Sequence, residues 1–278
     1  MCKVAIVVLH YENLLDTKEC LDSLLKYLTD DHTQIVVVDN GSVKEKLIEI
    51  ESNYKNSQVH FIYSKNNLGF SNGNNLGFAY AKHKLNADII ILANNDLVFK
   101  QTDFIEELVK AENRLHFDVA GPKIISLVDG TNQNPVPTIY RSLKDVKKRI
   151  LKFRILYLLS FLNIDVKLQN KYRNHNIRLN SINNEDFQLH GACMIFANRY
   201  IRAFDGLCDK TFMYGEESIL KYQCLKYNFK LCYLNQLEVF HKEGSTTNKI
   251  LGSNINKRRF YYTNNIRGCK VLEKLMRE

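Results

Sequence analysis

Residues 89–99, IIILANNDLVF, decide the fold that we expect for this chain. A short run of apolar residues is followed at once by the polar triplet Asn94-Asn95-Asp96. Strands that are apolar on both faces occur mainly in parallel sheets covered by helices. Ligands of such sheets bind beyond the carboxyl ends of the strands, so the triplet marks the edge where a site is expected.

The same alternation extends along the chain in both directions. Apolar stretches predict strands over 3–9, 34–38, 59–63 and 87–92, with helices over 16–28, 43–54, 71–84 and 102–112. The second half is less regular: it predicts helices over 143–163, 216–227 and 254–276, a strand over 187–197 and an extended segment over 229–234. We therefore predict an α/β fold with a Rossmann-like, mostly parallel central sheet flanked by helices.

Polar clusters follow each of the first four predicted strands. They are HYEN (10–13), DNGS (39–42), SKNN (64–67) and NND (94–96). Turn and capping chemistry explains one or two such clusters, but four at one sheet edge favour a binding site. Asp39 either accepts hydrogen bonds from a nucleotide or forms an Asx turn or a helix cap. Asp96 either binds Mg²⁺ or Mn²⁺ or belongs to a turn.

Three further segments carry candidate chemistry. Residues 68–78, LGFSNGNNLGF, place glycines at a spacing of four, which allows a close approach between a helix and a ligand. In Tyr214-Gly215-Glu216-Glu217, one glutamate is a candidate general base, although acidic residues also favour the first turn of any helix. His241 is a candidate metal ligand, with a purely structural role as the alternative.

Composition and charge limit the class of protein. The chain has 278 residues, 45% hydrophobic, and its net charge is +9. Residues 141–178 hold eleven Lys or Arg and two Asp, so this one segment carries a net charge equal to that of the whole chain. The seven scattered cysteines and the short apolar N-terminal run predict reduced thiols and a cytoplasmic protein without a secretory signal.

Taken together in their order and spacing, these segments resemble inverting glycosyltransferases of family 2 with the GT-A fold. The likeness is greatest to the rhamnosyltransferase-like bacterial branch that builds capsule, O-antigen or cell-wall polysaccharides. The segments that carry it are VAIVVLHYEN (4–13), IVVVDNGS (35–42), NNLGFSNGNNLGF (66–78), IIILANNDLVF (89–99), LHGACMIF (189–196), FDGLCDKTFMYGEE (204–217) and VFHKEGS (239–245).

The resemblance implies a role for each matching residue. The nucleotide-sugar pocket would comprise Tyr11, Glu12, Asp39, Asn67, Gly69, Gly73, Asn74, Asn95 and Asp96. Asp96 and His241 would bind Mn²⁺ or Mg²⁺, and His190, Gly191 and Tyr214 would contact the acceptor. Glu217 would be the catalytic base, with Glu216 as its rival. The chain departs from the family pattern at Asn94, at Glu217 where an aspartate is usual, and at Asn264-Asn265.

The resemblance also implies an organisation and partners. Residues 1–120 would bind the donor, and residues 121–245 would hold the acceptor and the catalytic base. Residues 246–278 would form a C-terminal helical segment, because the GT-A fold is expected to end in helices here. The donor would be a UDP- or dTDP-sugar, and the acceptor a glycan or a lipid-diphosphate-linked saccharide. The mixture of cations and apolar residues over 144–162 itself predicts docking on an anionic membrane surface at the inner face of the cell membrane, or on protein, including a second copy in a homodimer. Nucleic acid is not an expected partner.

Two other function classes are open on this pattern. A sugar nucleotidyltransferase would share the α/β fold, but it usually carries a glycine-rich basic loop after the first strand, where this chain has HYEN. A non-catalytic nucleotide-sugar-binding protein would have no need for acidic residues at both the metal and the base positions.

Overall fold

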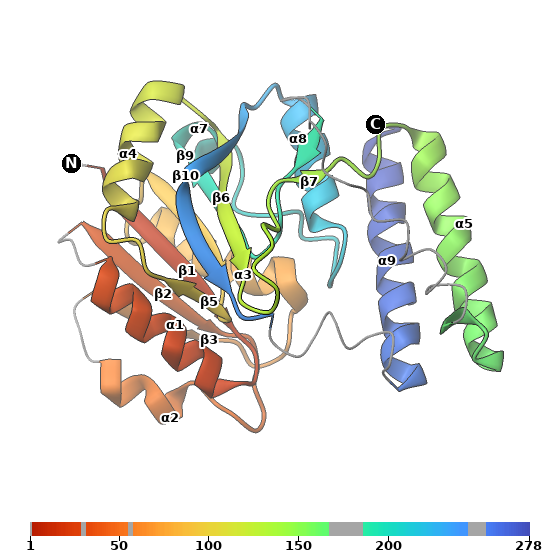
Figure 1. The fold of residues 1–278 in the computed structure, drawn as a ribbon, viewed down its shortest axis with the longest axis horizontal. Helices are drawn as coiled ribbons and strands as arrows, with labels where there is room; N and C mark the ends of the chain where they lie inside the picture. Colours follow the sequence, from red (N-terminus) through yellow and green to blue (C-terminus); the bar gives the residue numbers. More distant parts are fainter. Residues whose placement is uncertain (1, 29–31, 55–57, 167–185, 244–253) are drawn as a thin grey trace.

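An eight-stranded sheet forms the centre of this computed structural model, which describes residues 2–28, 32–54, 58–166, 186–243 and 254–278 (Figure 1). Its strand order is β3-β2-β1-β4-β9-β6-β10-β5. The strands are β1 (Val4–His10), β2 (Thr33–Asp39), β3 (Val59–Tyr63), β4 (Ile89–Asn94), β5 (Leu97–Phe99), β6 (Val119–Ser126), β9 (Cys193–Ala197) and β10 (Leu231–His241), with β7 (Val136–Pro137) and β8 (Phe187–Gln188) as a separate pair.

Helices surround this sheet and continue beyond it. They are α1 (Leu14–Tyr27), α2 (Ile48–Glu51), α3 (Gly69–His83), α4 (Phe104–Leu115), α5 (Leu143–Leu159), α7 (Asn198–Ala203), α8 (Glu216–Lys226) and α9 (Ile255–Leu275), with 3₁₀ turns at η1 (Ser52–Tyr54) and η2 (Ser160–Leu162). Side chains of α1 and α4 pack in the core on one face of the sheet, and side chains of α3, α7 and α8 pack in the core on the other. The sheet is therefore covered on both faces, as the apolar strands require.

The predicted mostly parallel sheet is confirmed. Strands β1 to β4 pair in parallel, as do β6 and β10, whereas β9 and β5 run antiparallel to their neighbours. The residues from Val4 to Val8 are at most 1% exposed, because β1 lies between β2 and β4 with helices on both sides. Strands from both predicted halves form one sheet, so the assignment of donor and acceptor binding to residues 1–120 and 121–245 stays a prediction.

The helix predicted over 43–54 is wrong in its first part. Backbone N–H groups of Val43, Lys44 and Glu45 donate to the carboxylate of Glu12, and the N–H of Leu47 donates to Asp39. These bonds hold the segment in an open loop, so the α-helix is limited to Ile48–Glu51, with the 3₁₀ turn after it.

The strand predicted over 187–197 is also wrong as a single element. It divides into β8 and β9, and residues 189–192 between them turn toward the carboxyl end of β4, where Ala192 O accepts from Asn94 N at 2.9 Å. The extended segment predicted over 229–234 becomes the longer β10. The helices predicted over 143–163, 216–227 and 254–276 are confirmed as α5 with η2, α8 and α9.

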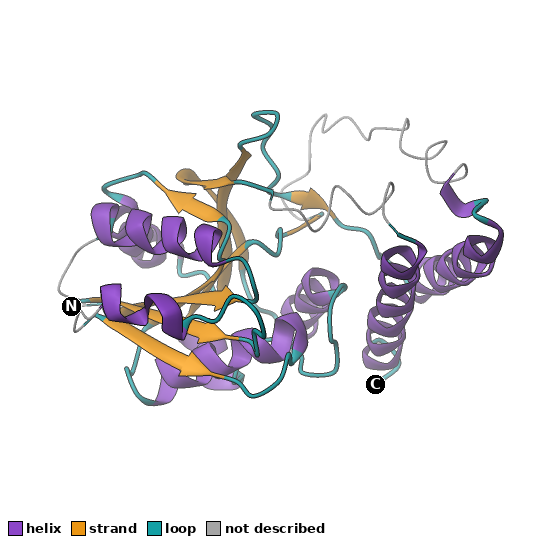
Figure 2. Ribbon diagram, turned by 90° about the horizontal axis from the view of Figure 1, so that it is seen from below, coloured by secondary structure: helices purple, strands orange, loops and turns teal. Residues whose placement is uncertain are grey.

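Helices α5 and α9 lie side by side, away from the sheet (Figures 1 and 2). Their interface buries Phe153 and Leu156 of α5 against Tyr262 of α9. At the end of η2, the fully buried Asp165 accepts from Arg258 Nε at 2.8 Å and from the Tyr262 hydroxyl at 2.8 Å. Residues 167–178 of the basic segment and 246–253 of the predicted C-terminal segment lie outside the described residues.

All seven cysteines are free thiols, as predicted. Within the described part of the chain, every helix is too short or too polar to cross a bilayer.

Candidate active site

The pairing of β10 with β5 brings Asp96 and His241 together. In this antiparallel ladder His241 lies opposite Leu97, and Lys242 N donates to the backbone oxygen of Asp96 at 3.0 Å. The imidazole Nε2 of His241 then lies 3.2 Å from Asp96 Oδ1. The two predicted metal ligands are thus adjacent, although they are far apart in the sequence.

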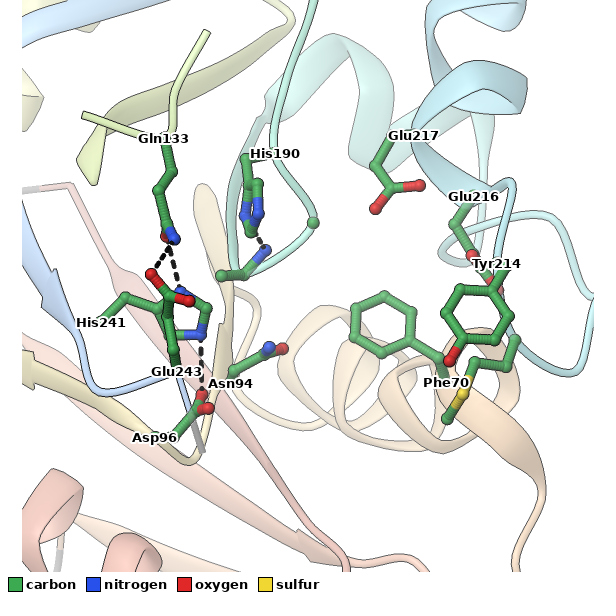
Figure 3. Close-up of a pocket in the computed structure, with 13 residues that line it drawn as sticks. Phe70, Asn94, Asp96, Gln133, His190, Tyr214, Glu216, Glu217, His241 and Glu243 are labelled. Carbon is green, nitrogen blue, oxygen red and sulfur yellow. Dashed lines mark hydrogen bonds and ion pairs between the residues drawn. The ribbon is translucent and has the colours of Figure 1, made fainter. Parts of the chain in front are cut away.

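Hydrogen bonds fix the orientation of the His241 ring. Glu243 Oε1 accepts from Gln133 Nε2 at 2.7 Å, so the other amide atom, Gln133 Oε1, faces His241 Nδ1 at 2.7 Å as an acceptor (Figure 3). Nδ1 therefore carries a proton, and in neutral His241 the lone pair of Nε2 points at the Asp96 carboxylate. The lone pair of Nε2 and the carboxylate oxygen repel each other, and a cation bound by both atoms would remove that repulsion. This pair of donors therefore fits a divalent metal.

A cavity of about 430 Å³ opens beside this pair. Seven predicted site residues line it together: Asp96, His190, Gly191, Tyr214, Glu216, Glu217 and His241. Asp96 and His241 lie on one side and the two glutamates on the other (Figure 3). Among the described residues, no group of three or more His, Cys, Asp or Glu converges as a metal site. A metal held here would therefore take further ligands from water or substrate oxygens.

The two glutamates begin helix α8. Gly215, at a φ of 101°, turns the chain into the helix, in which Glu216 is buried and Glu217 is partly buried. Burial raises the pKa of Glu216 to about 8, with the charge of Glu217 adding to the effect. Burial also raises the pKa of Glu217. Carboxyl groups with raised pKa values in a cavity are typical of proton-transfer sites.

Gly191 leaves room for the Glu217 side chain. A Cβ atom at residue 191 would lie 2.6 Å from Glu217 Oε1, closer than such atoms approach. Its neighbour His190 accepts through Nδ1 from Ala192 N at 3.1 Å, and its ring packs edge-on to His241 with 5.8 Å between centroids. Burial, with the neighbouring His241, lowers the pKa of His190 to about 4, so this imidazole is neutral near pH 7.

Apart from Asp96, the predicted nucleotide-binding residues lie outside the lining of this cavity. Asp39 accepts from Ser42 N at 2.8 Å and from Leu47 N at 3.0 Å, so in this structure its carboxylate holds the loop that follows β2. The Glu12 carboxylate accepts hydrogen bonds from the backbone N–H groups of residues 43–45. Tyr11 is 47% exposed, and Asn95 donates to Thr17 Oγ1 at 2.9 Å. None of these contacts assigns a ligand.

The remaining predicted residues of this group surround the start of α3. Asn67 Oδ1 accepts from Gly69 N at 2.8 Å and from Asn40 Nδ2 at 3.2 Å. Gly69, at a φ of 82°, lies so close to Phe212 that a Cβ would meet its backbone oxygen at 2.1 Å. Gly73 packs against Asn40 and Leu9, and Asn74 donates to Phe70 O at 3.0 Å. These glycines therefore permit the close packing of α3.

Gln133 and Glu243 were not predicted as site residues. Glu243 follows His241 by two positions, so its place beside a candidate ligand was a usable signal. Gln133 lies in the loop between β6 and β7, and no local pattern marks it. Phe70, Asn94 and Met213 also line the cavity.

Comparison with known proteins agrees with this geometry. The family model described as glycosyl transferase family 2 matches residues 5–196. The chain belongs to glycosyltransferase family 2. The matched region extends from β1 through β9 and thus includes Asp96 and His190-Gly191.

One curated relative and two solved structures are similar to this chain. The low-salt glycan biosynthesis hexosyltransferase Agl10 of Haloferax volcanii is 24% identical over 240 residues, which cover 86% of this chain and 67% of that protein. The structure of S. aureus TarS 1-349 in complex with UDP-GlcNAc aligns with a TM-score of 0.58 at 14% identity, over 91% of this chain and 61% of that one. The structure of GalNAc-T7 with UDP, GalNAc and Mn²⁺ aligns with a TM-score of 0.60 at 13% identity, over 95% and 48%.

These structural likenesses show the fold, which is GT-A as predicted. The chain covers 60–65% of the length of the TarS 1-349 structures and 38% of the longer TarS structure.

Proposed function

We propose that this protein is an inverting, metal-dependent glycosyltransferase that moves a hexosyl or deoxyhexosyl group from a UDP- or dTDP-sugar to an acceptor hydroxyl. The observation that carries this proposal is the cavity that Asp96 and His241 line on one side and Glu216 and Glu217 on the other. A leaving diphosphate and an attacking hydroxyl need these two kinds of group on opposite sides of the transferred sugar.

The spacing of the strands supports a nucleotide donor. β1 separates β2 from β4, and His10 of β1 is opposite Asp39 while Leu9 is opposite Asn94. The ends of β2 and β4 are therefore about 10 Å apart. A nucleoside bound near Tyr11, Asp39 and Asn67 would extend its diphosphate toward Asp96. A bound Mn²⁺ or Mg²⁺ at Asp96 and His241 supplies positive charge that stabilises the departing diphosphate. UDP-GlcNAc and UDP in the TarS 1-349 complexes, and UDP with Mn²⁺ in GalNAc-T7, support this choice.

Glu217 is the proposed base, because its carboxylate lines the cavity and Gly191 leaves room for it there. It would accept the proton of the acceptor hydroxyl as the new glycosidic bond forms and the bond to the diphosphate breaks. Glu216, whose pKa of about 8 keeps it protonated near pH 7, would donate a hydrogen bond instead.

The acceptor is proposed to be a growing cell-surface glycan linked to a lipid, reached at the cytoplasmic face of a membrane. Support comes from the outer face of α5 and η2. Leu151, Leu158 and Leu162 are 58–70% exposed there, and Lys147 and Lys148 lie exposed on the same helix. Exposed leucines next to lysines are typical of helices that lie on anionic membranes. A homodimer that buries this face is the alternative.

A donor panel tests the proposal. Purified protein is incubated with UDP- and dTDP-sugars and Mn²⁺ or Mg²⁺, and released nucleoside diphosphate is measured. We expect release from one donor class, loss of it with EDTA and in Asp96→Ala, and no loss in Asp103→Ala, which removes an exposed carboxylate of the same size.

Each rival gives a different product. A nucleotidyltransferase releases pyrophosphate when given a sugar phosphate and a nucleoside triphosphate, and a binding protein releases nothing. An Asp96→Ala variant with full activity would contradict the proposed metal role. Glu217→Gln and Glu216→Gln separate the two glutamates, since loss of the base should lower kcat by about 100-fold or more.

A further inference from the structure

A second cavity, of about 560 Å³, lies between the β6–β8 region and helix α5. The segment 132–139 forms one wall, and Arg149 of α5 projects from the other. Gln133 lines this cavity and the catalytic cavity, so the two adjoin at that side chain. Of the described residues that line the second cavity, none is acidic.

Two hydrogen-bond donors in this cavity are unused. Arg149 Nε and Thr138 Oγ1 are both buried, and neither has a hydrogen-bond partner in the described structure. The Arg149 guanidinium stacks on Phe153 with 4.7 Å to the ring centroid, which fixes its plane, yet no described carboxylate forms an ion pair with it. Leaving such groups unpaired costs about 1–3 kcal/mol each, more for a charge, so their retention indicates a ligand.

The position of Arg149 relative to the catalytic base is also defined. The ring of Tyr261 packs edge-on against Phe153, the side chain on which Arg149 stacks, with 5.8 Å between the ring centroids. Tyr261 packs edge-on against Tyr214 of the catalytic cavity at 4.9 Å between centroids. Arg149 thus stands on the glutamate side of the site.

We propose that Arg149 and Thr138 form a subsite for a phosphoryl group of the acceptor. The proposal rests on the proposed transferase function and adds the class of acceptor: one that carries a phosphate ester or diphosphate close to the hydroxyl that is glycosylated. A phosphoryl oxygen accepts hydrogen bonds from a guanidinium fork and a hydroxyl together, and the cavity supplies both without a competing carboxylate. A neutral sugar would leave the arginine charge uncompensated.

Binding of phenyl phosphate to the whole protein tests this subsite without turnover. Titration calorimetry is carried out in EDTA, so that a metal at Asp96 and His241 does not contribute. We expect Arg149→Gln to weaken binding by about tenfold or more and Thr138→Val by about threefold, because one bond is charge-assisted and the other is neutral. Lys148→Gln is the matched control, since it removes an exposed cation one residue away, and it should change the affinity less than about twofold.

Donor binding separates the acceptor subsite from a donor diphosphate site. Saturating UDP should leave the phenyl phosphate affinity unchanged, and Arg149→Gln should leave UDP affinity unchanged. Competition by UDP, an equal loss in Lys148→Gln, or no binding to the wild-type protein would each overturn the proposal. Thr138→Val, which keeps the size of the side chain, carries the test if Arg149→Gln fails to fold. A protein that binds phenyl phosphate as expected but releases no nucleoside diphosphate would contradict the transferase function and leave the phosphoryl site standing.

Discussion

Gly191 and Glu217 illustrate how one missing methyl group sets the geometry of the candidate site. With 2.6 Å between a Cβ at residue 191 and Glu217 Oε1, Gly191→Ala must displace the carboxylate. We expect kcat to fall by about 100-fold with little loss of stability, because a shift of about 1 Å in a reacting group has that effect. Steady-state kinetics and thermal melting check this.

The control for that variant is Gly130→Ala. Gly130 has a φ of 72° and no atoms within 4 Å of an added Cβ, so the substitution strains the backbone of its own turn without a steric clash. It should lower Tm slightly and leave kcat unchanged. Equal kcat values for Gly191→Ala and the wild-type protein would show that Glu217 is not confined as described.

Glu216 gives a prediction for the pH dependence of stability. Its carboxyl is protonated in both states below its ordinary pKa of 4.5, but between that value and about 8 only the folded state holds the proton. The free energy of unfolding should therefore fall as pH rises through this range, by up to ~1.4 kcal/mol per pH unit.

Glu216→Gln should remove this contribution, so that the variant gains stability relative to the wild-type protein at pH 8 but not at pH 4.5. Denaturant unfolding across this range measures the difference, with the exposed Glu49→Gln as control. A constant difference between Glu216→Gln and wild type at all pH values would contradict the burial of an ionisable Glu216.

At the scale of residues, the sequence predicted which polar side chains belong to the site, but it did not predict the groups to which they are hydrogen-bonded. Asp96, His241, Glu216 and Glu217 were predicted to act together, and they line one cavity. The backbone N–H groups that bind Glu12 were not predictable, because a loop's local pattern does not reveal a carboxylate from another strand. Gln133 was missed for the same reason: its contact with His241 depends on how β6 and β10 pair.

At the scale of elements, the strands with uniform apolar runs were predicted and β6 was not. Its sequence, VAGPKIIS, contains Gly121 and Pro122, which weaken a strand signal. The structure accommodates the proline because the pairing of β6 with β9 covers only Val119 and Ala120. The backbone N–H that Pro122 lacks is therefore not needed for a hydrogen bond to β9.

The junction between η2 and α9 gives a prediction at the same scale. Asp165 is fully buried and accepts from Arg258, which is 6% exposed, so Asp165→Ala leaves a buried guanidinium without this carboxylate. We expect a loss of about 3–5 kcal/mol in the free energy of unfolding, measured by urea denaturation. Asp205→Ala, which breaks an exposed pair with Lys82, should cost about 0–1 kcal/mol. Similar losses in both variants would show that the buried pair does not anchor α5 to α9.

At the scale of the whole molecule, two contacts join distant parts of the chain into one site. The β5–β10 ladder brings His241 to Asp96, and Gly268 of α9 lies so close to the α8 entry that a Cβ would meet Tyr214 O at 2.3 Å. Helix α9 thus supports the loop that carries the glutamates, and α5 packs on α9 from outside. The sequence predicted each of these helices but not their pairing, since the hydrophobic pattern of one helix does not identify its partner.

The outer face of α5 carries the last prediction. Lys144, Lys147 and Lys148 are exposed, and changing all three to Gln removes three charges while Arg149 stays in place for the phosphoryl subsite. Each cation near an anionic membrane contributes about 1 kcal/mol, so binding to phosphatidylglycerol vesicles should weaken by about 100-fold at low salt.

Vesicle co-sedimentation over a range of salt concentrations measures this effect. The control changes Lys18, Lys65 and Lys84, three exposed lysines on the sheet domain, to Gln and alters the net charge by the same amount. Because a membrane senses charge within about 10 Å of its surface, the control should bind nearly as well as the wild-type protein. If the two triple variants lose equal affinity, the attraction comes from overall charge, and the face of α5 is then left for a protein partner. If only the α5 variant loses affinity, the lysines of this helix face the anionic lipid, as the proposed docking of a lipid-linked acceptor requires.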